Sequence, residues 1–379
     1  MEYSVRRENK MTQIKQLSKL MQSKSVLFMI GVFVILALLP VLISDNFFLT
    51  ILTLTTIFSI YAASWNFLAN SGQGSLGHAL FLGVGGFAAA IIGSTLANAT
   101  ADLLGSAQIP VGAISVTIQI LSTIVGGLLS AGIGLLIGLA CVRLKAWYLA
   151  MVTFGFSVIA ATISSQFDSV THGINGFATT TLVPRGFPFY ILVLSFAMVS
   201  IIVMYIITKS RIGMAFRAIH GNEPEAKMIG INTAKYKLIA FVISTFFAGI
   251  AGGLYAYFFR LIDNSVFSPL NSFTPLIMSV IGGLGTVMGP IIGAIFLVGV
   301  QQTLAMPSVV ESLRTSLGQF FPEVSNVGAP LSFLIIGIIL LVIVIFAPKG
   351  LEPQLRKLYK YIAEALQDKD KKAVEEQKP

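Results

Sequence analysis

The placement of charged residues constrains the fold of this chain more than any other feature of the sequence. Seven intervals of 22 residues or more contain no charged side chain: 46–101, 103–142, 146–167, 186–208, 238–259, 264–310 and 324–348. Four of them are 22 to 25 residues long, and the other three are 40 to 56 residues long. About 20 apolar residues form one helical crossing of a bilayer. Each shorter interval therefore fits one membrane helix, and each longer interval fits two.

The composition supports this interpretation and excludes a water-soluble globule. Hydrophobic residues make up 55% of the 379 residues and charged residues 11%, against about 25% charged residues in ordinary soluble domains. The single cysteine, Cys141, rules out an intrachain disulfide framework. We therefore expect an all-α polytopic membrane protein.

The basic residues define the expected orientation. Of 25 Lys and Arg residues, 22 fall in four regions, which are 1–24, 143–145, 209–237 and 349–378. Cytoplasmic loops carry the excess of Lys and Arg, so both termini are predicted to be cytoplasmic and the number of crossings even. The net charge of +9 then divides into 22 − 10 = +12 inside and 3 − 6 = −3 outside. The charge is a topology signal and does not indicate nucleic-acid binding.

An apolar run at 26–43 precedes the seven intervals, and the interval 103–142 is assigned one helix of the two that it could hold. The prediction is therefore about ten helices: 26–43, 47–69, 79–97, 117–141, 147–164, 189–208, 238–259, 272–284, 289–306 and 331–347. Glycines interrupt 272–306, so two short or re-entrant helices fit there as well as two full crossings. Three regions follow: a basic cytoplasmic tail at 1–25, a membrane domain at 26–347 with a cytoplasmic loop at 209–237, and a cytoplasmic tail at 348–379.

The predicted crossings contain no Asp, Glu, Lys or Arg. Coupling to a proton or sodium gradient usually requires an ionisable group inside the membrane, so uphill transport needs energy from a partner at the cytoplasmic surface. The chain has no phosphate-binding GxxxxGK[ST] loop, no catalytic triad and no cluster of residues with metal-ligand spacing. We therefore expect a transport protein and not an enzyme, with no metal site and no cofactor.

The loop at 209–237 predicts a short capped helix. Asn222 suits an N-cap and Pro224 the first turn, and Glu223 and Glu225 complement the positive helix end. Gly230 can end the helix in a left-handed conformation. A polar helix of about two turns is marginal alone in water, so we expect it to dock on a soluble partner, although a plain surface helix is the alternative.

Two glycine-dense stretches are candidates for the solute path. Gly-interrupted hydrophobic segments in the two halves of a transporter point to its binding site. The candidate residues are Gly72, Gly74, Ser75, Gly77 and His78 in the first stretch and Gly282, Gly283 and Gly285 in the second. Close helix packing without solute contact is the alternative, and His78 is expected to form hydrogen bonds at a helix end. Asn175, between two glycines, is a further candidate for the solute path, in a tight turn predicted at the external mouth.

Five blocks in this order resemble the M-type permease subunits of branched-chain amino-acid ABC importers: GQGSLGHALFLGVGGFAAA at 72–90, RLKAWYLAMVTFGF at 143–156, HGINGF at 172–177, the segment 210–237, and IGGLGTVMGPIIGA at 281–294 followed by APKGL at 347–351. The resemblance spans roughly 47–351. It implies a type II ABC importer fold of about ten helices in the cytoplasmic (inner) membrane.

The resemblance also implies a set of partners. These are a homologous H-type permease in a heterodimer, two cytoplasmic ATPases that bind ATP and magnesium, and an external solute-binding protein. The coupling helix would contain Asn222, Glu223, Glu225, Ala226, Lys227, Gly230 and Asn232. Lys227 replaces an alanine and Ala146 a glycine of the family pattern. The implied solute is a branched-chain or other apolar amino acid, with urea, short amides or a stand-alone channel or facilitator as alternatives.

Overall fold

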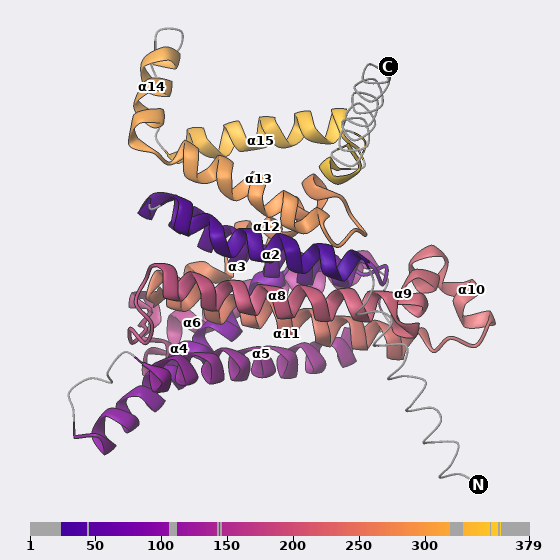
Figure 1. The fold of residues 1–379 in the computed structure, drawn as a ribbon. Helices are drawn as coiled ribbons and strands as arrows, with labels where there is room; N and C mark the ends of the chain where they lie inside the picture. The colour runs from indigo at the N-terminus through magenta and orange to yellow at the C-terminus, as the bar shows by residue number, and fades with distance from the viewer. Residues whose placement is uncertain are drawn as a thin grey trace, which may run out of the picture.

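The computed structural model describes residues 24–43, 45–105, 112–141, 144, 146–318, 329–348, 350–354 and 357. The elements are α2 (Lys24–Leu42), α3 (Asn46–Ala69), α4 (His78–Leu103), α5 (Ala113–Cys141), α6 (Ala146–Gln166), α7 (Asp168–Thr171), η1 (Gly173–Asn175), β1 (Phe177–Ala178), α8 (Phe187–Lys209), α9 (Arg211–Gly221), α10 (Glu223–Met228), α11 (Thr233–Phe259), β2 (Leu261–Ile262), η2 (Asn264–Phe267), α12 (Pro269–Gly282), α13 (Gly289–Leu304), α14 (Pro307–Gly318) and α15 (Ala329–Phe346). The fold is mostly helical (Figure 1).

Six helices in the described part of the chain are long and apolar enough to cross a membrane. They are α3, α4, α5, the 147–166 part of α6, α8 and α11, with lengths of 20 to 29 residues. Each coincides with one of the predicted crossings. Local sequence sets their ends where a cap is present: the Asp45 carboxylate accepts the Phe47 N–H at 3.0 Å and begins α3.

The glycine-interrupted region forms two short helices, as one of the two predicted alternatives. α12 has 14 residues and α13 has 16. At 1.5 Å per residue these helices are about 21 and 24 Å long, less than the roughly 30 Å thickness of the hydrocarbon core. The first and last predicted crossings correspond to α2 and α15. The number ten and the orientation of the termini stay predictions, and most of the two predicted tails lies outside the described residues.

The core is a close contact of α4, α5 and α11 through small residues. A Cβ atom on Gly85 of α4 would lie 2.3 Å from Cα of Gly249 on α11, and one on Gly126 of α5 would lie 2.5 Å from the Gly85 oxygen. Such backbone contacts allow membrane helices to pack by dispersion forces. α11 is the most buried of the six candidate spans and α6 the least. Figure 1 shows α13 and α15 side by side on the opposite flank of the bundle from α5.

The loops gather in two groups. In one group β1 pairs with β2, Phe177 opposite Ile262, which joins the segment before α8 to the segment after α11. In the other group α9 contacts the end of α3, and α10 packs against α9 and α11. Both short helices extend beyond the ends of the long helices (Figure 1). The charge pattern predicts this grouping of loops, because it assigns the β1 and β2 segments to one side of the membrane and the 209–237 loop to the other.

Candidate coupling site and transport path

α10 is the predicted short helix, and local bonds close both of its ends. The Asn222 Oδ1 atom accepts the Glu225 N–H at 3.5 Å, and the Asn222 amide donates to the Glu225 carboxylate at 2.5 Å. At the other end Gly230 has φ +83°, a conformation that favours glycine. The N–H of Gly230 donates to Lys227, and that of Ile231 to the Ala226 oxygen, both at 3.0 Å. These two bonds form a Schellman motif.

Glu223 joins α10 to the start of α11. Its carboxylate pairs with Lys227 at 3.1 Å, accepts the Thr233 hydroxyl at 3.1 Å and pairs with Lys237, which is buried. Partial burial alone would raise the pKa of Glu223, but the bonds from Lys237, Lys227 and Thr233 outweigh it and hold the pKa below the ordinary carboxyl value. Sequence reasoning missed Lys237 and Thr233, since nothing local marks a partner 14 residues away.

Asn232 has a structural role that the sequence did not assign. Its side chain accepts the Lys235 N–H at 3.1 Å and so caps α11. The turn from Ile229 to Asn232 thus ends one helix and begins the next. α10 is therefore connected to α11 both by this turn and by the ion pair of Glu223 with Lys237.

The tip of α10 exposes apolar side chains in a polar loop. Met228 is 87% exposed and Ile229 is 74% exposed, whereas Ala226 is buried beneath them. Glu225 and Lys227 are exposed on the same short helix. Exposed apolar residues with a polar rim are typical of a protein–protein contact.

α9 attaches this loop to the membrane helices. It is amphipathic, with Phe216 and Ile219 buried, and the Phe216 ring makes an edge contact with Phe67 of α3 at 5.6 Å between centroids. His220 forms a hydrogen bond through Nδ1 with the Ala69 main-chain oxygen at 3.0 Å. The spacing of the apolar residues in 212–219 is the signal from which α9 could have been predicted.

The first glycine stretch begins at the end of the bundle that carries α9 and α10. A Cβ atom on Gly72 would lie 3.2 Å from Cα of His220, whereas one on Gly74 would meet no atom within 4 Å. The main-chain oxygen of Ser75 accepts the Trp65 indole N–H at 2.7 Å. Gly72 therefore lies beside α9, and the role of Gly72, Gly74 and Ser75 in a solute path stays a prediction.

The stretch continues into the bundle at Gly77 and His78. A Cβ atom on Gly77 would lie 1.8 Å from the Thr153 oxygen, so glycine is required for close contact with α6. His78 is fully buried, and its Nε2 atom lies 3.0 Å from the Ser64 hydroxyl oxygen. The expected hydrogen-bonding role of His78 at a helix end is what the structure shows.

The second glycine stretch is the tight turn between α12 and α13. A Cβ atom on Gly282 would lie 1.6 Å from the Gly289 oxygen, and one on Gly350 would lie 2.4 Å from Cα of Gly283. Gly285 has φ +78° and donates its N–H to the Asn66 side chain at 3.0 Å. Gly282 and Gly283 therefore lie in close backbone contacts here, and their role in a solute path stays a prediction.

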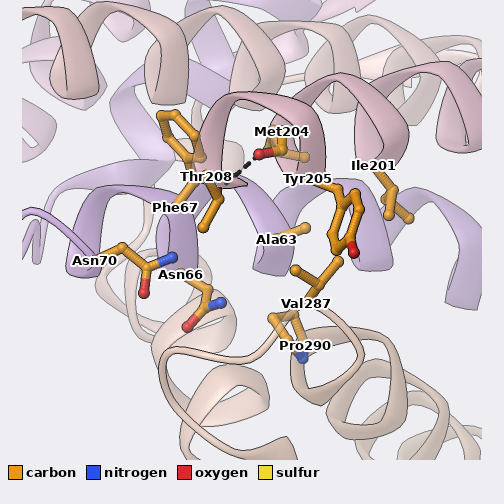
Figure 2. Close-up of a pocket in the computed structure, with 10 residues that line it drawn as sticks. All are labelled: Ala63, Asn66, Phe67, Asn70, Ile201, Met204, Tyr205, Thr208, Val287 and Pro290. Atoms are coloured by element: carbon orange, nitrogen blue, oxygen red, sulfur yellow. Dashed lines mark hydrogen bonds between the residues drawn. The ribbon is translucent and has the colours of Figure 1, made fainter. Parts of the chain in front are cut away.

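A narrow pocket lies where α3, α8 and the α12–α13 turn meet. Figure 2 shows the residues that line it: Ala63, Asn66, Phe67, Asn70, Ile201, Met204, Tyr205, Thr208, Val287 and Pro290. None of the predicted path residues lines this pocket. Asn175 lies far from it, exposed in the β1 group of loops, where its N–H donates to the His172 oxygen at 3.1 Å.

These features define a class of protein. The bundle has six candidate membrane spans and an exposed capped helix at one end, and the part of the chain that the structure describes holds no group of three metal-ligating side chains. Such an arrangement is that of a multi-pass membrane transport subunit. The family model "Branched-chain amino acid transport system / permease component" matches residues 47–344, and the chain belongs to that family.

Relatives agree with the family. The high-affinity branched-chain amino acid transport system permease protein LivM of Escherichia coli is 25% identical over 367 residues, covering 88% of this chain and 76% of the relative. The probable LivM of Methanocaldococcus jannaschii is 26% identical over 282 residues, covering 73% and 78%. The probable LivH of that organism is 27% identical over 144 residues, covering 38% and 45%. No solved structure matches the chain significantly.

The chain is therefore a permease subunit of an ABC importer, an inner-membrane protein with several crossings, and not an enzyme. The resemblance stated from the five sequence blocks is confirmed.

Proposed function

We propose that this permease imports branched-chain or other apolar amino acids together with an H-type permease, two ATPase subunits and an external solute-binding protein. The names of the LivM relatives support the solute, and similarity to both LivM and LivH supports a pair of homologous permeases. ATP and magnesium bind to the ATPase subunits. This chain contributes the membrane path and the surface on which the ATPases act.

The observation that carries the proposal is the construction of α10. α10 projects from the end of the bundle (Figure 1), and the side chains at its tip, Met228 and Ile229, are exposed. Glu223 joins the helix to Lys237 of the long α11. A partner that binds the tip can therefore move α11 without first unfolding the loop. This is what coupling to ATP hydrolysis outside the membrane requires.

We place the solute path beside the second half of α3. Both glycine stretches contact that half, His78 through Ser64 and Gly285 through Asn66. The spans there offer hydroxyl, amide and main-chain groups and no carboxylate or ammonium. An amino-acid zwitterion can bind to such groups, since N–H groups at helix starts attract a carboxylate and main-chain oxygens accept from an ammonium.

A matched pair of substitutions tests the docking surface. Ile229→Glu adds a charge to the tip of α10, and Ile174→Glu makes the same change at a residue of similar exposure, 78%, in the opposite loop group. Desolvating a charge at a protein contact is costly, so Ile229→Glu should reduce both co-purification of the ATPase subunits and leucine uptake by the reconstituted complex. Ile174→Glu should leave ATPase co-purification unchanged. Normal ATPase binding by the Ile229→Glu complex would contradict the proposal.

A further inference from the structure

Gln73 lies in the loop between α3 and α4, residues 70–77, and its contacts reach the coupling region. The side chain is 5% exposed. Its Nε2 atom donates to the Lys237 main-chain oxygen at 2.9 Å and to the Ser71 hydroxyl at 2.9 Å. Gln73 and Lys237 are 164 positions apart in the chain, so this amide joins two segments that have no local reason to meet.

Lys237 receives contacts from both sides. Its ammonium pairs with Glu223 of α10, and its main-chain oxygen accepts the hydrogen bond from Gln73. The same residue thus links the coupling helix to the 70–77 loop. A displacement of α10 reaches Gln73 through one ion pair, one residue of α11 and one hydrogen bond.

The 70–77 loop is bonded so that it cannot absorb such a displacement. Ser71, which accepts from Gln73, donates its hydroxyl to the Leu68 oxygen at 2.7 Å. At the far end of the loop Gly77 packs against the Thr153 oxygen of α6, with no room for a Cβ atom. Movement of Gln73 is therefore passed to the end of α3 and toward the start of α4 and its contact with α6.

We propose that Gln73 is a positioning residue that transmits movement of the coupling helix, through Lys237, to the 70–77 loop and the start of α4. The proposal rests on the proposed coupling role of α10 and deepens it. His220, which bonds to the end of α3 directly, is a second contact between the same regions. Gln73 differs from His220 because its hydrogen-bond partner, Lys237, is also the ion-pair partner of Glu223.

The series arrangement gives a test by a double-mutant cycle. Gln73→Met removes the amide and keeps the length of the side chain, and the Lys237 oxygen keeps the N–H of its own helix as a partner. Lys237→Met removes the ion pair with Glu223. The complex with its partner subunits is reconstituted in liposomes, and radiolabelled leucine uptake is measured per ATP hydrolysed.

Each single variant should lower leucine uptake per ATP by about tenfold, which lies within the usual range of coupling between two sites. The rate of ATP hydrolysis should stay near that of the wild type. The double variant should lower uptake per ATP by no more than the larger single effect. The two substitutions interrupt the same chain of contacts, from Glu223 through Lys237 to Gln73, so their effects do not add. Gln119→Met is the matched control. Gln119 is also buried, at 1% exposed, and its side chain has no hydrogen-bond partner among the residues that the structure describes. Uptake per ATP by this variant should therefore equal that of the wild type.

Two results would overturn the inference. One is wild-type uptake per ATP in Gln73→Met, or in Gln73→Asn if the first variant fails to accumulate in the membrane. The other is a double variant whose loss is the product of the single losses, which indicates independent sites. If Ile229→Glu abolishes coupling while the Gln73 variants are normal, only this inference fails. If Ile229→Glu has no effect, the proposed function itself fails.

Discussion

The Asn66 side chain accepts the main-chain N–H of Gly285 at 3.0 Å, across 219 positions of sequence. The same amide donates to the Thr286 main-chain oxygen at 2.7 Å. One side chain thus satisfies both a main-chain donor and a main-chain acceptor of the α12–α13 turn. Asn66 itself is 4% exposed. Asn66 therefore holds the glycine-rich α12–α13 turn to α3, and no pattern in the sequence indicates this role.

Asn66→Asp should destabilise the protein. The carboxylate still accepts from Gly285 but cannot donate to the Thr286 oxygen, and it places a charge in a buried position. The expected loss is about 1–3 kcal/mol, measured as a lower thermal midpoint in detergent. Asn98→Asp, at an exposed position of α4, is the control and should leave the midpoint nearly unchanged. An equal midpoint for both variants would show that the Asn66 bonds contribute nothing.

Gly282→Ala should disrupt the α12–α13 turn. The added methyl group would lie 1.6 Å from the Gly289 oxygen, and such overpacking costs about 1–3 kcal/mol. The control is Gly299→Ala in α13, where a Cβ atom meets nothing within 4 Å and where alanine favours the helix. Thermal unfolding should be earlier for the first variant and unchanged or later for the second. The opposite order would contradict the observed packing.

Gly230→Pro should uncouple the transporter. Proline fixes φ near −65°, whereas Gly230 has φ +83° and donates its N–H to the Lys227 oxygen. The end of α10 would be lost, and ATP-dependent leucine uptake should fall while membrane insertion stays normal. Gly221→Ala, at an open position ending α9, should transport normally. Full uptake by the proline variant would mean that α10 need not be folded.

The attachment of α10 should weaken in acid. The pKa of Glu223 is lowered from the ordinary value of 4.5, so the bonds of its carboxylate stabilise the loop fully above that value. The stabilisation is lost as the pH falls below 4.5 through the lowered pKa. Hydrogen exchange of 222–231, corrected for the intrinsic rate, should show protection falling in that window. Glu223→Gln should remove the pH dependence, and protection that rises on acidification would contradict the pairing.

The sequence predicts well those features that depend on neighbouring residues. The six long spans follow from uncharged runs of sufficient length, and the capped α10 follows from Asn222, Pro224 and Gly230, which act within one short segment. The grouping of loops follows from charge. Each of these needs no knowledge of which helices touch.

Features that depend on contacts between distant segments could not be predicted. Nothing near Gln73 indicates that its amide meets the Lys237 oxygen, and nothing near Gly350 indicates that it packs on Gly283. The glycine stretches show the same limit. A glycine that allows close packing and one that exposes backbone to a solute have the same sequence signature, and only the position of the neighbouring backbone separates them.

The most direct test is leucine flux into liposomes that contain this chain alone or the chain with its H-type permease, ATPases and binding protein. The account predicts no flux from the chain alone and uptake against a gradient by the complete complex when ATP is supplied. Leucine flux through the chain alone, unaffected by ATP, would contradict it and would indicate a stand-alone facilitator.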